Sequence, residues 1–328
     1  MKILKRTSNT TIKNQYEHII AWGTGPLFRN NYQEKYFPID CIIDGTGKQV
    51  GQELAGNCIK DINYLKDIEG KTLIIIYAIY ESEILEQIRM FDVEVDTIIY
   101  SLIDVELNEG ISLPRINAKN AEDILVYGLL NQIRGADNLQ FLEVGVCHPI
   151  MRNNTYLLYE IFSKLPGYKG VLVEANPLCW NLIEEYRSKD KLIKKGIGLE
   201  KGVMPFYAFP GLLGHSTFVY ELAEKKKKKG HDYQVIDVDI DTLNQIIEEN
   251  FDRTPDLLAI DAEGLDFQIL KSWDYKKYPF KIIISEMMEE NEDEIKKIMA
   301  ERGYKIYAMT VENVIWLRMD LFEKISKY

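Results

Sequence analysis

Short apolar segments alternate with helix-compatible segments along this sequence, and several of them end at a glycine or a carboxylate. The predicted strands cover residues 18–22, 39–43, 73–77, 95–100, 141–144, 171–173, 193–197, 257–260 and 282–285. Residues 81–90 have the apolar spacing of a helix, and residues 304–309 and 314–318 predict a closing antiparallel pair. Strands that alternate with helices predict an α/β fold with mostly parallel, doubly wound sheets.

The length of the chain predicts two domains. A single hydrophobic core rarely grows to 328 residues. Residues 108–120 contain Gly110 and Pro114 and show no period, which is typical of a linker, and residues 121–132 resemble a helix that begins the next domain. We therefore expect two tandem Rossmann-like domains, at residues 1–115 and 116–328.

Composition excludes several classes of protein. Hydrophobic residues make up 46% and charged residues 28%, which is ordinary for a globular protein and excludes a disordered or collagen-like chain. The longest apolar runs, such as residues 73–76, are too short to span a membrane. The net charge is −11 and neither predicted domain is basic overall, which argues against nucleic-acid binding. We expect no secretory signal, because no apolar stretch follows the basic residues at the N-terminus.

The four cysteines share no metal-type spacing, and each lies in or beside an apolar segment. They are Cys41, Cys58, Cys147 and Cys179. Buried, reduced thiols are typical of a cytoplasmic protein, and we expect that location.

Two strand ends in the second domain carry residues that suit a nucleoside ligand. Glu143 and Gly145 end the strand at residues 141–144, and His148 follows shortly after. Glycine permits close approach of the backbone, and Glu143 can hold an ammonium group. The next strand ends at Glu174, followed by Asn176, and an acid at this position can accept hydrogen bonds from ribose hydroxyls.

Three carboxylates lie within six residues after the strand at 257–260. They are Asp261, Glu263 and Asp266. Carboxylates held this close together need a cation, a metal ion or a proton. The alternative is a helix N-terminus that carries acids, which the helix dipole favours.

Taken in order, these motifs resemble the FkbM family of S-adenosylmethionine-dependent methyltransferases. The resemblance covers roughly residues 120–320, and it rests on an ordered set of segments. They are Glu143-Val-Gly145, Glu174-Ala-Asn176-Pro177, Asp241-Thr-Leu243, Ile260-Asp261-Ala-Glu263-Gly264-Leu-Asp266 and the late strand ending in Glu286. His148-Pro149 and Asn153-Asn154-Thr155-Tyr156 are similar to one branch of the family.

The resemblance implies a class I methyltransferase fold and S-adenosylmethionine as the cofactor. It implies transfer of a methyl group to a hydroxyl of a sugar or glycoconjugate, in surface polysaccharide biosynthesis. The expected cofactor-binding residues are Glu143, Gly145, His148, Glu174, Asn176 and Asp261. His148 has an alternative role as a local hydrogen-bond anchor. Val146 and Cys147 differ from the usual first motif, which leaves open a binding protein without turnover.

Methyl transfer to a hydroxyl needs a base that reaches the acceptor oxygen. The candidate catalytic residues are Asp261, Glu263 and His215, and His215 lies in a glycine-flanked loop that can close over an acceptor. An inert loop histidine is the alternative. Related sugar methyltransferases outside this family use a divalent metal, which Asp261, Glu263 and Asp266 can hold, although we assign no metal ligand.

Two further features of the sequence each allow more than one interpretation. Residues Lys225 to Lys229 form a basic run, which is either a solvated helix end or a clamp for an anionic acceptor. In the first domain, Gly23-Thr24-Gly25 and Asp44 resemble a reduced nucleotide-binding motif. That domain is either a scaffold without a ligand or a nucleotide-sugar-binding domain, and the nicotinamide site of an oxidoreductase is a weaker alternative.

Overall fold

The computed structural model describes residues 1–36, 38–108, 111–112, 116–133, 138–287 and 291–325. The chain divides into two compact units, Met1–Arg115 and Ile116–Tyr328. Part of the linker expected at 108–120 lies outside the described residues. Its first residues are not irregular, because β10 (Glu106–Asn108) and β11 (Ile111–Ser112) form an antiparallel pair.

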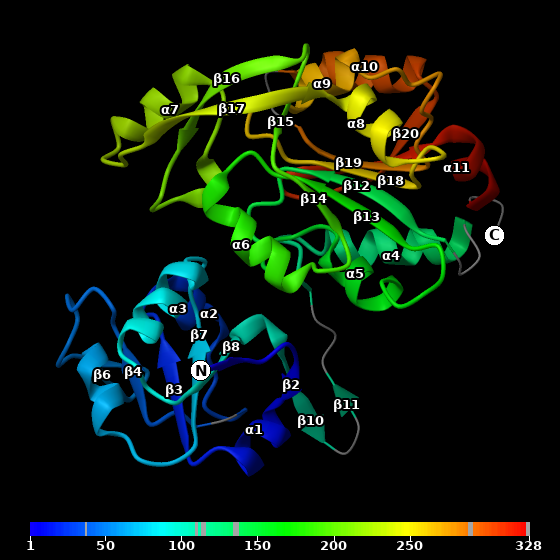
Figure 1. Ribbon diagram of the computed structural model, residues 1–328. Coiled ribbons are helices and arrows are strands. Elements are labelled where there is room, and N and C mark those ends of the chain that lie inside the picture. The colour runs from blue at the N-terminus through cyan, green and yellow to red at the C-terminus, as the bar shows by residue number, and fades with distance from the viewer. Residues whose placement is uncertain (37, 109–110, 113–115, 134–137, 288–290, 326–328) are drawn as a thin grey trace. The chain divides into compact units, whose positions relative to one another are not determined.

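The first unit is built on a mostly parallel sheet with helices between the strands (Figure 1). Within the described residues its strand order is β1 (Lys2–Ile3), β8 (Asp96–Ile99), β7 (Thr72–Ile76), β3 (His18–Trp22), β4 (Cys41–Ile43), β6 (Asn57–Lys60) and β5 (Glu53–Leu54). The remaining elements are β2 (Thr7–Ser8), α1 (Asn9–Gln15), α2 (Pro26–Asn31), η1 (Ile62–Asp67), α3 (Glu81–Met90), η2 (Tyr100–Leu102) and β9 (Ile103–Asp104). In α3, Ile84, Leu85 and Ile88 are buried against the sheet, as their helical spacing predicts.

The second unit has a larger sheet whose strands are parallel except at one edge. Its described order is β14 (Lys191–Ile193), β13 (Lys169–Val173), β12 (Gln140–Val144), β18 (Leu257–Ile260), β19 (Ile282–Glu286), β21 (Asn313–Arg318) and β20 (Tyr304–Met309). The closing antiparallel pair is β20 and β21. The chain is thus a mixed α/β protein with two mostly parallel sheets, which confirms the predicted fold class.

Helices cover both faces of this second sheet (Figure 1). On one face lie α8 (Leu243–Asn250), α9 (Asp266–Ser272) and α10 (Glu292–Glu301). On the other lie α4 (Glu122–Ile133), α5 (Tyr156–Phe162), α6 (Pro177–Tyr186) and α11 (Met319–Ile325). Because both faces are buried, the central strands are apolar at nearly every position rather than alternating.

A smaller sheet extends from the second unit, and the sequence analysis missed it. It contains β15 (Gly196–Gly198), β17 (Gln234–Thr242) and β16 (Gly202–Ala208), and it carries η3 (Leu213–His215) and α7 (Tyr220–Lys227). The strand predicted at 193–197 is wrong as one element, because it is divided between β14 and β15. The Lys195 ammonium bonds Asp241 of β17 at 2.7 Å, where the chain passes from one sheet to the other.

The topology sets where a ligand can bind. Strand β12 is paired with β13 on one side and with β18 on the other, so the strand order reverses beside it. In doubly wound sheets, ligands bind outside the carboxyl ends of the strands at such a reversal. The loops that follow β12, β13 and β18 meet there.

Candidate methyltransferase site

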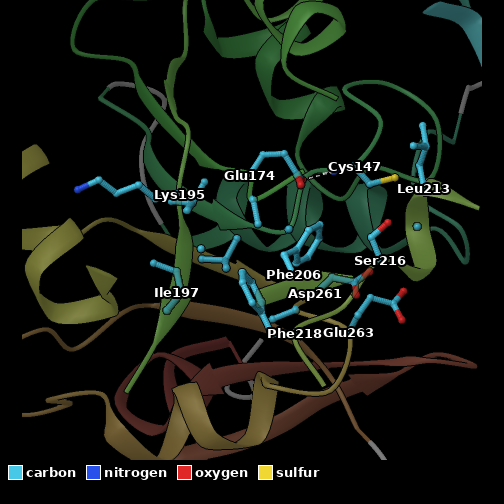
Figure 2. A pocket seen from close by; sticks show the side chains of 17 residues that line it. Cys147, Glu174, Lys195, Ile197, Phe206, Leu213, Ser216, Phe218, Asp261 and Glu263 are labelled. Atoms are coloured by element: carbon cyan, nitrogen blue, oxygen red, sulfur yellow. Dashed lines mark hydrogen bonds between the residues drawn. The ribbon is translucent and has the colours of Figure 1, made fainter. Parts of the chain in front are cut away.

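A pocket of about 600 Å³, including its open mouth, lies at the carboxyl ends of β12, β13 and β18 (Figure 2). Its wall is lined by Val144, Gly145, Cys147, Val173, Glu174, Ala175, Lys195, Gly196, Ile197, Phe206, Leu213, Gly214, Ser216, Phe218, Asp261, Ala262 and Glu263. Of the sequence-predicted residues, the pocket brings together Gly145, Glu174, Asp261 and Glu263.

Gly145 allows two strand ends to approach each other at the pocket floor. Its φ is +79°, and a Cβ atom there would lie 1.7 Å from the carbonyl oxygen of Asp261. The Gly145 N–H donates to the Val173 carbonyl at 2.9 Å, and the Asp261 N–H donates to the Val144 carbonyl at 2.9 Å. A side chain at this position would push the Asp261 loop away from β12.

Glu174 presents its carboxylate to the pocket from the end of β13. One oxygen accepts the Cys147 N–H at 2.7 Å (Figure 2). The other accepts the Asn176 N–H at 2.7 Å. Burial raises the pKa of Glu174, and these backbone hydrogen bonds act in the opposite direction. Glu174 lines the pocket, where its carboxylate oxygens can accept hydroxyl hydrogen bonds from a ligand.

Asn176 and His148 do not line the pocket. Their side chains make hydrogen bonds that hold the segments after β13 and β12 in place. The Asn176 side chain caps α6 by accepting from the Leu178 N–H at 3.1 Å, and its amide nitrogen donates to Ser216 at 3.2 Å. The Nδ1 atom of His148 accepts from the N–H groups of Ile150 and Met151 at 3.1 and 3.0 Å. The structure thus gives His148 the contacts of a local hydrogen-bond anchor.

Glu143, which the sequence analysis expected to contact the cofactor, lies away from the pocket wall. Its side chain does not line the pocket. It accepts from Asn153 at 3.0 Å and from Thr155 at 2.6 Å, and it lies 3.9 Å from Arg187. The reason is strand alternation, because Leu142 and Val144 pack on the α8 and α9 face and Glu143 faces the opposite side.

Arg187 is the centre of this buried network and was missed by the sequence analysis. It is 1% exposed and donates to Asp190 at 2.7 Å and to Thr155 at 2.9 Å. It also donates to the Pro149 carbonyl at 3.2 Å and to Asn153 at 3.1 Å. The network therefore fixes the segment that follows β12. Hydrophobic patterning gives no signal for a buried arginine of this kind.

The carboxylates of Asp261 and Glu263 both face the pocket, and both hold protons more tightly than usual. Burial, followed by the charge of Asp266, raises the pKa of Asp261 well above its ordinary value. Burial, followed by the charge of Glu286, raises the pKa of Glu263 to about 8. Protein surrounds Asp261 on most sides, but its side chain faces the open space of the pocket. A ligand can therefore reach it. Groups tuned in this way are typical of sites that move protons.

The side chain of Asp266 lies apart from those of Asp261 and Glu263. It accepts the Ala262 N–H at 3.2 Å and lines a second cavity, of about 300 Å³, together with Glu286. In the ranges that the structure describes, no group of three or more His, Cys, Asp or Glu side chains is arranged to hold a metal ion. The metal site considered from Asp261, Glu263 and Asp266 is therefore not supported.

His215 lies beside the mouth of the pocket, in η3, and is half-buried. Its Nδ1 atom is 4.0 Å from a carboxylate oxygen of Glu263. Burial, followed by the positive charge of Lys226, lowers the pKa of His215. The imidazole is therefore favoured in its neutral form, which can accept a proton.

The apolar end of the pocket comes from the smaller sheet, which the sequence analysis did not find. Ile197 lies on β15, Phe206 on β16, and Phe218 follows η3 (Figure 2). Phe206 and Phe218 contact each other with ring centroids 4.7 Å apart. The alternation of apolar residues with aspartates at 236–240 was the signal that could have revealed β17.

In the first unit, the structure accounts for Asp44 without a ligand. Its carboxylate accepts from the Thr46 N–H at 3.0 Å, the Thr46 hydroxyl at 2.8 Å and the Gln49 N–H at 2.8 Å. Gly23, with φ of +117°, packs against the Tyr77 carbonyl. These contacts anchor a turn, and they do not support the nicotinamide-site alternative.

No helix within the described ranges is long and apolar enough to cross a membrane.

Comparisons with known proteins agree on one activity. The Methyltransferase FkbM domain matches residues 143–306, which is half of the chain. The chain is also 25% identical over 181 residues to "Methyltransferase sdnD" of Sordaria araneosa, covering 45% of this chain and 70% of that protein. No solved structure matches the chain significantly.

Proposed function

The chain belongs to the FkbM family of methyltransferases, and we propose that it transfers a methyl group from S-adenosylmethionine to a hydroxyl of a saccharide. The observation that carries this proposal is the pocket at the ends of β12, β13 and β18. It combines the Glu174 carboxylate, an apolar aromatic end and two carboxylates with raised pKa.

The residues of the pocket fit the donor. Glu174 has acceptor capacity for a ribose diol. Ile197, Phe206 and Phe218 provide an apolar surface for a flat base. When bound, S-adenosylmethionine would supply a methyl group activated by a positively charged sulfur, and Asp261, in its ionised form, would stabilise that positive charge from the pocket wall.

Glu263 is the proposed base. The transfer forms an O–CH₃ bond, breaks the S–CH₃ bond and releases the hydroxyl proton, which a group of the site must accept. A base works best when its pKa is near the working pH, and the pKa of Glu263 is raised to about 8. His215, 4.0 Å away, can take the proton onward, and Asp261 orients the acceptor hydroxyl.

The proposal also covers the acceptor of the methyl group, the cellular location of the reaction and the unit of the chain that carries it out. The sugar hydroxyl and the role in surface polysaccharide biosynthesis rest on the family resemblance. A cytoplasmic reaction is supported by the cysteines, since Cys41, Cys58, Cys147 and Cys179 are all free. We assign methyl transfer to residues 116–328, because every residue lining the pocket falls there, and we assign no ligand to the Rossmann-like residues 1–115.

The test is transfer of a labelled methyl group from S-adenosylmethionine to a panel of sugars and nucleotide sugars. We expect transfer by the full chain and its loss in Asp261→Asn, with the fold retained. Asp252→Asn, at an exposed position away from the pocket, is the matched control. Near-normal rates in Asp261→Asn would exclude the role assigned to that residue, and no transfer to any hydroxyl acceptor would count against the proposed reaction.

A further inference from the structure

A serine hydroxyl in the wall of the pocket carries a proton that no described group of the protein accepts. Ser216 directly follows η3, lines the pocket and is 7% exposed (Figure 2). Its Oγ atom accepts the Phe209 N–H at 3.1 Å and the side-chain amide of Asn176 at 3.2 Å. The Asn176 oxygen accepts from the Leu178 N–H, which sets the direction of that amide. A hydroxyl has two lone pairs and one proton, so the lone pairs of Ser216 are in use and its proton is left to donate.

The loop that carries Ser216 is held against the groups that fix Glu174. The Asn176 N–H donates to one oxygen of that carboxylate, and the Cys147 N–H donates to the other. Gly214, two residues before Ser216, lies against Cys147, since a Cβ atom on Gly214 would be 3.7 Å from the Cys147 sulfur. The loop is therefore fixed to the segments that follow β12 and β13, next to the carboxylate assigned to the ribose.

The other polar side chains of the wall are poor hydrogen-bond donors for a ligand. The carboxylates of the wall, in their ionised forms, accept hydrogen bonds and cannot donate them. The ammonium group of Lys195 is already bound to Asp241 at 2.7 Å. The Cys147 thiol is a weak donor. Among the described side chains that line the pocket, the Ser216 hydroxyl is therefore the strong donor that a ligand can still use.

The amino-acid tail is the part of the proposed methyl donor that needs such a group. Glu174 is assigned to the ribose and the aromatic end of the pocket to the base, whereas the tail ends in a carboxylate that can only accept. The acidic wall repels that carboxylate, and a hydrogen bond to a charged acceptor is stronger than one between neutral groups. We infer that the Ser216 hydroxyl binds the carboxylate of the amino-acid tail of S-adenosylmethionine. This inference rests on the proposed function and names a residue that selects the donor.

The experiment is a calorimetric titration of the full chain with S-adenosylmethionine and with decarboxylated S-adenosylmethionine, which lacks only the carboxylate. We expect the wild-type protein to bind S-adenosylmethionine about tenfold or more tightly than the decarboxylated compound. Ser216→Ala should weaken binding of S-adenosylmethionine about tenfold and change that of the decarboxylated compound by no more than about twofold. Ser216→Cys, which keeps an atom at the same place but donates weakly, should show the same selective loss. Ser188→Ala, at an exposed position of the same unit, is the matched control and should bind both compounds like the wild-type protein.

Each other outcome overturns the inference. If the wild-type protein binds the two compounds equally, the pocket does not select the carboxylate. If Ser216→Ala weakens both compounds by the same factor, Ser216 only supports its loop, and if it weakens neither, the hydroxyl makes no contact with the donor. A loss in Ser188→Ala as large as that in Ser216→Ala would make the effect nonspecific. Failure of the wild-type protein to bind either compound would instead remove the proposed function, so the two failures are distinguishable.

Discussion

Replacing Gly145 with alanine should damage both the stability and the site of the second unit. The new Cβ atom would lie 1.7 Å from the Asp261 carbonyl oxygen, so the two strand ends must separate by about 1.3 Å to reach a tolerated contact. Alanine at the φ of +79° adds a cost of about 1–2 kcal/mol. The forced separation adds about 1–3 kcal/mol. The expected loss is therefore about 2–5 kcal/mol in the free energy of unfolding.

Thermal unfolding followed by tryptophan fluorescence measures this loss. The second unit contains Trp180, Trp273 and Trp316, and a Trp22→Phe background removes the tryptophan of the first unit. For a unit of this size the loss corresponds to a decrease in Tm of about 5–15 °C. The same variant should bind S-adenosylhomocysteine at least about tenfold more weakly, because the Asp261 loop moves relative to Glu174.

Gly202→Ala is the control, since a Cβ atom there meets no atom within 4 Å. It should change Tm by no more than about 2 °C. If Gly145→Ala unfolds and binds like the wild-type protein, the close approach of β12 to the Asp261 loop is not what shapes the pocket.

Two other predictions concern the proposed base and the buried network. The rate of methyl transfer should rise with pH through about 8, because Glu263 accepts a proton only when it is ionised. The Glu263→Gln variant should lose this rise in its pH–rate profile. An unchanged profile would exclude Glu263 as the base. Arg187→Met should lower the free energy of unfolding by about 3–5 kcal/mol, because Glu143 and Asp190 keep buried charges without their partner. Urea denaturation beside the exposed control Lys189→Met checks this, and a loss below about 1 kcal/mol would contradict it.

Strands of the two large sheets were predictable because their apolar runs are buried on both faces. The smaller sheet was not, since β16 and β17 are only partly buried, and the apolar residues of β17 alternate with aspartates. As a result the aromatic end of the pocket, at Phe206 and Phe218, was missed. The boundary between β14 and β15 was also missed, because the sequence does not reveal that Lys195 pairs with Asp241.

The site was predicted as a set of residue types but not as a geometry. Spacing alone grouped Asp261, Glu263 and Asp266, yet positive φ values at Glu263 and Gly264 turn the chain so that Asp266 faces the second cavity. Motif resemblance predicts that Glu143 contacts the cofactor, whereas strand alternation places its side chain on the face of the sheet that Arg187 also occupies. Arg187 is buried on the same face of the sheet as Glu143, and it belongs to no motif that the sequence analysis identified.

The most direct test of the account is the affinity of the full chain for S-adenosylmethionine and S-adenosylhomocysteine, measured by calorimetry. We predict about micromolar binding of both, weakened about tenfold or more in Glu174→Gln, because hydrogen bonds to a charged acceptor are lost. Glu184→Gln, at an exposed position in the same unit, should bind like the wild-type protein. Absence of binding by the wild-type chain, or equal affinity in Glu174→Gln, would contradict a methyltransferase site at the ends of β12, β13 and β18.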